Sequence, residues 1–392
     1  MSKAFKLLIV SQALANLADI FLRISVMTYV YMLSKSALVT AVIPIVIGIS
    51  SFLASLLLPL LTQSLALNRI LSITQAGKTF FIFLLLLALM TKKQMNLFIL
   101  YTSFSLISVL DGFAVPASHA IIPRYADDLG KSNALFSVVN EGIQLIGWGL
   151  GAGIVPLLGM KNSFFLILMQ FALASFLLFL LPKLEIGEVG TTSNWTILFR
   201  GWSLIRKNSS LRLMLQVNSL EIMANTIWVS SILLVFVSVV LKETEVYWGY
   251  VNILFSLGNI FGGLVAYRYS EYLLKRRWES MLCSVLLMGL LTFILVQFPN
   301  PFLFLTISLG IGVFAPLKEV PENVIIQEGV EELYLASVYA AFEVVSTIVF
   351  SISVMIMGVI SDRWGVQMTF YLATFCLIIE SYWIYKQKSA LV

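Results

Sequence analysis

Polar and charged side chains lie in the middle of the first long apolar stretch of the sequence, residues 5–33. Asn16, Asp19 and Arg23 are spaced three and four residues apart, so a helix places them on one face. A charge at membrane depth costs at least about 2.5 kcal/mol and persists mainly where it faces a bundle interior or a watery cavity. We interpret this face as one wall of a central pathway.

A second triplet, Asn218, Glu221 and Asn225, repeats the pattern, with Asn218 placed 202 positions after Asn16. At the same offset Glu141 matches Glu343. The sequence therefore predicts two repeats whose matching faces meet around a site near the membrane midplane.

Seven acidic residues fall within the apolar stretches, together with only three basic ones. The acids are Asp19, Asp111, Glu141, Glu221, Glu319, Glu322 and Glu343, and the bases are Arg23, Lys78 and Lys318. Two spacings allow structural ion pairs one helical turn apart, Asp19 with Arg23 and Lys318 with Glu322.

Glu221 and Glu343 have no basic residue within a helical turn. At 1.5 Å per residue, each lies roughly 15 Å from the start of its helix, near the middle of a ~30 Å hydrocarbon core. A carboxyl group there can load and release a proton, or neutralise a cationic substrate. The alternative is a protonated acid that is hydrogen-bonded in the core.

The composition is that of an integral membrane protein. Of 392 residues, 59% are hydrophobic and 11% are charged, well below the quarter that is typical of soluble domains. Long apolar runs without alternation predict helices instead of a barrel. One histidine, two isolated cysteines and no glycine-rich phosphate loop exclude a metal centre, a catalytic triad and a nucleotide site. We expect no enzyme, no cofactor and no nucleic-acid partner.

Twelve spanning helices are predicted from the apolar runs and the turn-like breaks between them. They cover residues 5–33, 37–62, 69–91, 95–121, 131–156, 161–182, 210–240, 244–269, 277–298, 300–326, 332–360 and 364–386. The loop lysines and arginines concentrate on one side, which predicts that both termini are cytoplasmic. The fold class is an all-α membrane protein with two six-helix repeats.

The longest loop, residues 183–209, separates the two predicted bundles, 1–182 and 210–392. Apolar residues recur in it at helical spacing, namely Trp195, Leu198, Phe199, Trp202 and Ile205. This pattern predicts an amphipathic helix on the inner leaflet, with protein binding as the alternative.

One segment carries a family resemblance. It runs from Phe113-Ala114-Val115-Pro116-Ala117-Ser118-His119 through Pro123-Arg124 to Asn133-Ala134-Leu135. With twelve spans in two repeats, the chain resembles the major facilitator superfamily. The segment is similar to that of its twelve-span drug:proton antiporters, the macrolide-efflux-like branch. The chain departs from that branch at Trp148, where proline is typical, and at Ile107, where arginine is typical.

The resemblance implies a secondary transporter of the cell membrane that exports a small amphipathic or cationic organic solute by alternating access, with proton influx as the drive. Multidrug resistance is the associated role. The expected partners are a small-molecule substrate, protons and the lipid bilayer, and we expect a monomer. One alternative is uptake or flipping of a nutrient or lysolipid-like solute, and another is a non-transporting membrane sensor or assembly partner.

Overall fold

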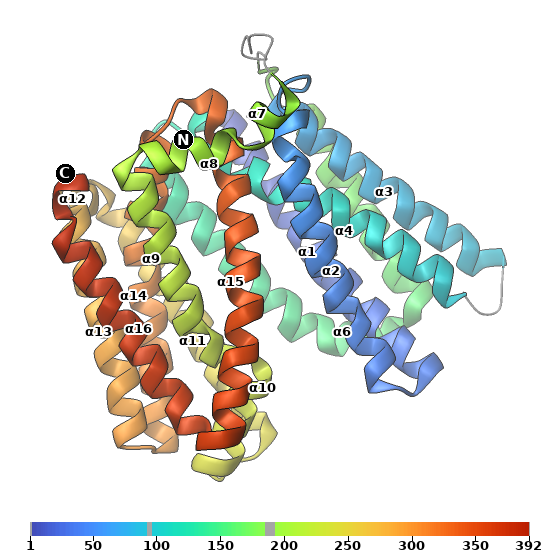
Figure 1. Ribbon diagram of the computed structural model, residues 1–392. Helices are drawn as coiled ribbons and strands as arrows, with labels where there is room; N and C mark the ends of the chain where they lie inside the picture. Colours follow the sequence, from blue (N-terminus) through green and yellow to red (C-terminus); the bar gives the residue numbers. More distant parts are fainter. Residues whose placement is uncertain (1, 92–95, 185–192, 392) are drawn as a thin grey trace. The chain divides into compact units, whose positions relative to one another are not determined.

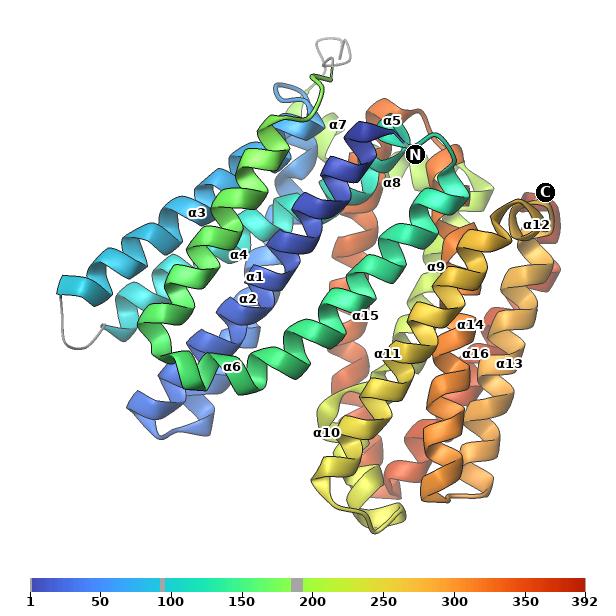
Figure 2. The same ribbon diagram turned by 180° about the vertical axis from the view of Figure 1, so that it is seen from behind.

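The computed structural model describes residues 2–91, 96–184 and 193–391. The long helices are α1 (Lys3–Ser34), α2 (Ala37–Leu61), α3 (Leu67–Thr91), α4 (Leu97–Ala120), α6 (Leu129–Phe179), α9 (Ser209–Asn225), α11 (Glu245–Arg268), α13 (Arg277–Gln297), α14 (Pro301–Glu328), α15 (Leu335–Trp364) and α16 (Val366–Lys386). The short ones are α5 (Ile122–Tyr125), α7 (Asn194–Leu198), α8 (Arg200–Lys207), α10 (Ser230–Val235) and α12 (Ser270–Lys275), with η1 (Thr226–Trp228), η2 (Phe236–Val240), η3 (Glu332–Tyr334) and η4 (Lys388–Ala390). Within the described ranges there is no strand, so the predicted all-α class is confirmed (Figures 1 and 2).

Eleven helices in the described ranges are long and apolar enough to cross a membrane, and a bent pair makes a twelfth. The helix α6 supplies two of them, Leu129–Val155 and Leu157–Phe179, and its backbone leaves the helical region at Gly159, where φ is 70°. The predicted spans 131–156 and 161–182 correspond to its two parts. The protein is therefore a multi-pass membrane protein with the expected set of spans.

Several helix ends follow from local sequence. Ser2 caps α1 by accepting a hydrogen bond from the Phe5 N–H at 3.0 Å, and α1 stops at Lys35, which adopts a left-handed conformation. Asn300 caps α14, accepting from the Leu303 N–H at 3.2 Å, and Pro301 occupies the first helical position. These signals made the breaks visible in the sequence.

The seventh span, predicted as continuous over 210–240, is broken. Here α9 ends at Asn225, Val229 is extended with ψ at 134°, and the following segment is bent by 44°. Thr226 donates its hydroxyl hydrogen bond to the Ile222 carbonyl at 2.9 Å, and side-chain bonds of this kind bend helices. The apolar run alone did not reveal this break.

The amphipathic segment of the loop is also divided in the structure. Its residues form two short helices, α7 and α8, separated at Phe199. The rings of Trp195 and Phe199 stack with their centroids 6.2 Å apart, and both side chains are exposed. Ile205, by contrast, is buried. The predicted amphipathic segment is thus helical but interrupted at Phe199, and the preceding polar part of the loop, 185–192, lies outside the described residues.

The described chain divides into two compact units. Unit 1 comprises residues 1–127, 142–201 and 332–344, and unit 2 comprises 128–141, 202–331 and 345–392. The division cuts α6 after Glu141 and α15 after Val344. Each of these two helices therefore contributes to both units, and the cut in each falls at or next to an acid of the predicted pathway.

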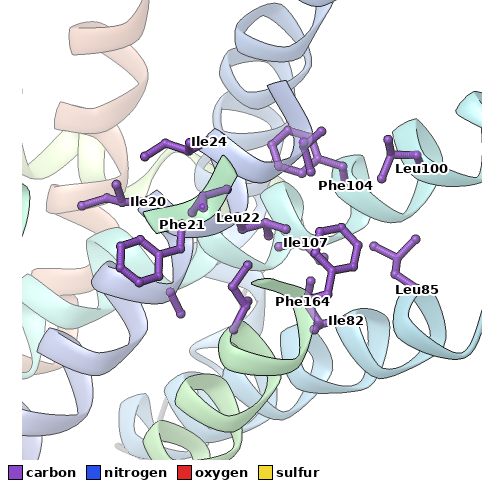
Figure 3. Packing of buried hydrophobic residues seen from close by; sticks show 14 of the residues in the cluster. Ile20, Phe21, Leu22, Ile24, Ile82, Leu85, Leu100, Phe104, Ile107 and Phe164 are labelled. Atoms are coloured by element: carbon purple, nitrogen blue, oxygen red, sulfur yellow. The ribbon is translucent and has the colours of Figure 1, made fainter. Parts of the chain in front are cut away.

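The core of unit 1 is an apolar cluster contributed by α1, α3, α4 and the second part of α6. Figure 3 shows Phe21 and Leu22 of α1 packed near Ile82, Ile107 and Phe164. All five side chains are buried. This packing fixes the helices that carry Asp19, Lys78 and Asp111.

In unit 2, α14 packs against both α11 and α13, and α16 packs against α13 and α9. The contact between α11 and α14 depends on missing side chains. A Cβ at Gly262 would collide with the Val313 backbone, and one at Gly258 with the Leu309 carbonyl. The glycines of α11 therefore allow its close contact with α14.

Candidate functional site

Unit 1 contains a buried ion cluster centred on Lys78 of α3. Its ammonium donates hydrogen bonds to Asp19 Oδ2 of α1 at 2.6 Å and to Asp111 Oδ1 of α4 at 2.9 Å. Arg23 Nη2 lies 3.5 Å from Asp111 Oδ2. The cluster therefore contains two cations and two carboxylates, and its formal charge is balanced.

The pairing in this cluster differs from the pairing suggested by spacing. Asp19 bonds to Lys78 from another helix, and Arg23 reaches Asp111 instead of Asp19. Sequence spacing detects partners only within one helix, whereas Lys78 arrives from a helix that begins some fifty residues later. The structure brings four predicted residues together here, but in a different arrangement.

Unit 2 contains a second cluster, centred on Lys318 of α14, whose side chain is fully buried. The ammonium contacts Glu322 Oε2 at 2.7 Å, one turn along the same helix, and Glu380 Oε1 of α16 at 3.4 Å. It also donates a hydrogen bond to Glu221 Oε2 of α9. The predicted Lys318–Glu322 pair is confirmed.

Glu221 therefore does have a cationic partner, contrary to its local sequence. No base lies within a helical turn of it, but the fold brings Lys318 to it from another helix. The expectation that Glu221 is unpaired was wrong for the same reason as the Asp19 pairing: the decisive contact is tertiary.

Glu380 is a member of this cluster that the sequence analysis missed. It lies in the apolar run of the last predicted span, close to the helix end at Lys386. In the structure its side chain is fully buried, and neither carboxylate oxygen has a hydrogen-bond donor within the described part of the chain. Its buried position on the same face as the apolar residues of α16 was the available signal.

The two clusters differ in charge. Unit 2 places three carboxylates around a single ammonium, whereas unit 1 has a second cation, Arg23, beside Asp111. With every carboxyl ionised, the unit 2 cluster would carry two net negative charges in a buried place. Such an excess is expensive unless a proton or another cation neutralises it.

Two further predicted acids of unit 2 accept hydrogen bonds from serine hydroxyls instead of pairing with a lysine. Glu141 Oε1 accepts a hydrogen bond from the Ser256 hydroxyl of α11 at 2.5 Å, and Glu319 Oε2 accepts one from Ser137 at 3.2 Å. Glu141 is half-buried, and Glu319 is exposed although its neighbour Lys318 is buried. Neither forms an ion pair with Lys318, although the charges of Glu221, Glu322 and Lys318 act on Glu319.

Glu343 is half-buried on α15 in unit 1. Among the described residues of that unit no cation pairs with it, and the charged group acting on it is another acid, Asp111. The absence of a base near Glu343, expected from its sequence, therefore holds within unit 1.

The predicted amides differ in their contacts, and Asn218 forms a side-chain hydrogen bond with Glu322 of the Lys318 cluster. Asn218 accepts a hydrogen bond from the Ser346 hydroxyl at 3.1 Å, Asn16 is half-buried on α1, and Asn225 is exposed at the last residue of α9. Asn225 thus marks the point where the seventh span breaks, and it does not join the lysine cluster.

Within the described ranges, no group of three histidine, cysteine, aspartate or glutamate side chains is arranged to hold a metal ion. The two cysteines are free, Cys283 being exposed and Cys376 buried. The chemistry available at the two clusters is therefore acid–base and ion-pairing chemistry.

Solved structures of other proteins have a similar fold, and part of the sequence matches a family model. Residues 222–389 match the model of the Major Facilitator Superfamily. Solved structures share the fold over nearly the whole chain at low identity. A bacterial homologue of the iron transporter ferroportin in an outward-facing state has a TM-score of 0.79 and 13% identity, covering 99% of this chain and 100% of that one. The Escherichia coli fucose:proton symporter FucP has 0.77 and 13%, covering 97% of each.

Two Bacillus subtilis (strain 168) proteins are similar along almost their full length. The uncharacterized MFS-type transporter YfmI is 28% identical over 99% of this chain and 97% of its own length. The uncharacterized MFS-type transporter YjbB is 25% identical over 95% of this chain and 94% of its own. The C-terminal part of the chain is thus similar to the Major Facilitator Superfamily model, and nearly its whole length is similar to two proteins described as MFS-type transporters.

Proposed function

We propose that this chain is a secondary active transporter that exports a small amphipathic or cationic organic solute in exchange for protons. Its sequence resemblance to the drug:proton antiporter branch supports the outward direction. The protein would move its substrate across the membrane by alternating access. A promiscuous apolar cavity would then confer resistance to several drugs.

The observation that carries the proposal is the acid excess around Lys318 in unit 2. Burying two net charges costs several kcal/mol, so the cluster gains stability from one added proton. An ionised carboxylate can only accept hydrogen bonds, whereas a protonated one can also donate. A protonated Glu380 would therefore need no donor from the protein. The cluster is a place where a proton can be held at membrane depth and given up again.

Among the three glutamates, Glu221 is the one best placed to exchange that proton. Its side chain is 16% exposed, compared with 7% for Glu322 and 0% for Glu380. Protonating Glu221 would weaken its attraction to Lys318 and leave the ammonium to the two buried carboxylates. A change at α9 would then accompany proton loading.

Glu141 and Glu343 are candidates for a secondary role. Each lies where its helix passes from one compact unit to the other, and the two correspond at the repeat offset of 202 positions. In an alternating cycle these positions would sense the rearrangement of both units. We expect both to matter less than Glu221 for proton coupling, because neither forms an ion pair with a lysine of its own unit.

The same proposal includes the location and topology. The protein would reside in the cell membrane as a monomer, with the bilayer around it and both termini in the cytoplasm. Positive loop charge supports this orientation, because cytoplasmic loops of membrane proteins are enriched in lysine and arginine. Cysteine labelling near Lys35 and Lys388 from outside intact cells would test it, with only the first site reacting.

The proposed function is tested with the purified protein in sealed vesicles. A panel of cationic, neutral and anionic fluorescent solutes is offered under an imposed pH gradient, and movement is followed with and without a protonophore. We expect cationic or amphipathic probes to move against the proton flow and to stop when the gradient collapses. Movement of probe in the same direction as protons would establish uptake instead. Movement of none of the probe classes would favour a non-transporting role.

A further inference from the structure

One end of unit 2 carries cations that lie on aromatic rings. It is formed by α12, the start of α13 and the end of α16, which lie together near the C-terminus (Figures 1 and 2). The Arg276 guanidinium is 5.5 Å from the ring centre of Tyr272, the Lys386 ammonium 5.6 Å from that of Tyr382, and the Lys388 ammonium 5.5 Å from that of Trp278. We name these six residues the basic–aromatic rim.

The cations of the rim are not neutralised by acids. Over the ranges that the structure describes, Arg276, Lys386 and Lys388 make no ion pair. All three side chains are exposed. They are therefore a local excess of three positive charges with room for an anion.

Neighbouring basic residues at the same end behave differently. Lys275 pairs with Glu271 at 2.7 Å, Arg277 with Glu328 at 2.7 Å and Lys131 with Asp128 at 3.4 Å; these six residues are the matched comparison. The hydrogen bond from Lys275 lowers the pKa of the Glu271 carboxyl, which stays ionised and balances its lysine. The excess charge is thus confined to the rim.

A cavity of about 660 Å³ adjoins the rim and shares Trp278 with it. Five of the paired residues line it, namely Asp128, Lys131, Glu271, Lys275 and Arg277, together with Leu274, Glu279 and Leu391. The acids and bases of the lining balance one another, so the cavity is polar without net attraction for either sign. A hydroxyl-bearing group could enter it while an attached anion remained on the rim.

The rim lies at the ends of two helices that are long and apolar enough to cross a membrane, α13 and α16. Tyr272 is 59% and Tyr382 is 55% exposed. Exposed tyrosines at such helix ends are typical of the membrane–water interface, where each nearby lysine or arginine adds attraction for anionic lipids. Both the ring and the charge are therefore at headgroup level.

We propose that the basic–aromatic rim binds the phosphodiester of an anionic glycerophospholipid, whose polar headgroup extends into the adjoining cavity. The three cations contact the phosphate, and the rings hold their side chains in place at the edge of the bilayer. The site depends on the multi-pass fold and not on which solute is transported. It gives unit 2 a preference for anionic lipid at this end.

The test uses the full-length protein in detergent, titrated with micelle-dispersed phosphatidylglycerol and, separately, with phosphatidylcholine, followed by native mass spectrometry. The rim variant is Arg276→Gln, Lys386→Gln and Lys388→Gln together. Its matched control, Lys3→Gln, Lys6→Gln and Lys207→Gln, removes three exposed cations elsewhere. We expect phosphatidylglycerol to bind the rim variant roughly 100-fold more weakly, as about 1 kcal/mol for each basic residue implies. The control should bind within about twofold of the wild type.

Four results would overturn the proposal. Equal weakening in both triple variants would mean that only diffuse surface charge attracts the lipid. If phosphatidylcholine binds as tightly as phosphatidylglycerol, the net charge of the lipid does not determine binding. Displacement of the lipid by millimolar inorganic phosphate would assign the rim to a free anion. If the rim variant binds phosphatidylglycerol as tightly as the wild type, the rim serves another partner, such as an acidic protein segment.

Discussion

Replacing Lys318 by methionine should destabilise unit 2 more than any other single change to a lysine. The side chain keeps its length, but the ammonium that three glutamates share is lost. Removing one partner of a buried ion pair typically costs about 3–5 kcal/mol. We expect Lys318→Met to lie toward the upper part of that range, because the described part of unit 2 offers these carboxylates no second cation. In unit 1, Lys78→Met leaves Arg23 beside Asp111 and should cost less.

A native thiol reports the effect. Cys376 is 3% exposed and lies one helical turn before Glu380 on α16, whereas Cys283 is exposed. In a Cys283→Ser background, the rate of maleimide labelling therefore follows the opening of unit 2. A loss of about 4 kcal/mol corresponds to roughly a 1000-fold increase in the open population. Lys207→Met, at an exposed lysine, should label within about twofold of the parent.

Two additional observations make this prediction sharp. Adding Glu380→Gln to Lys318→Met should slow labelling again, because it removes a buried charge that has lost its partner. Lowering the pH from 8 to 5 should also reduce the difference, since protonated glutamates need no ammonium. If Lys318→Met labels at the rate of Lys207→Met at both pH values, the cluster does not stabilise unit 2 and the reasoning fails.

Two other changes test packing and hydrogen bonding. Gly262→Leu should prevent close contact of α11 with α14, so the folded, monodisperse protein should be lost in size-exclusion chromatography. Gly149→Leu, where a Cβ meets no atom within 4 Å, should elute as the wild type. Equal elution profiles of the two variants would refute the packing account. The amides of Asn133 and Gln327 exchange two hydrogen bonds, at 2.8 and 3.0 Å, so each alanine variant should lose about 1–3 kcal/mol of unfolding free energy by leaving a buried amide unpaired. The double variant should lose less than the sum, and full additivity in denaturant titrations would show that the pair is not coupled.

The spans were predictable because their signals are local. Apolar length defines each membrane helix, and Ser2, Lys35 and Asn300 mark ends through caps that involve only neighbouring residues. The break after Asn225 escaped because its polar residues, Asn225, Thr226, Ser230 and Ser231, lie within a long apolar run, and the backbone leaves the helical region only at Val229. Apolar content does not distinguish a straight span from a bent one.

Residues of the candidate site could be named from the sequence more readily than the contacts between them. The repeat pointed to Asp19 and Glu221, and in the structure each pairs with a buried lysine. The lysines, however, come from non-equivalent places, Lys78 from the third span and Lys318 from the tenth. Which helix faces which is decided by packing, so pairing by spacing failed for Asp19 and missed Glu380 entirely.

We propose that the carboxylates around Lys318 carry the proton that drives transport. Glutamine keeps the size and hydrogen bonding of glutamate but cannot titrate, so Glu221→Gln separates proton movement from substrate binding. The measurement compares, in reconstituted vesicles, pH-gradient-driven transport with gradient-free exchange of the same probe. Asp19→Asn, Glu141→Gln, Glu343→Gln and Glu380→Gln form the accompanying series. We predict that Glu221→Gln loses gradient-driven transport and keeps exchange. If every variant retains the proton dependence of the wild type, these carboxylates are structural and the claim is contradicted.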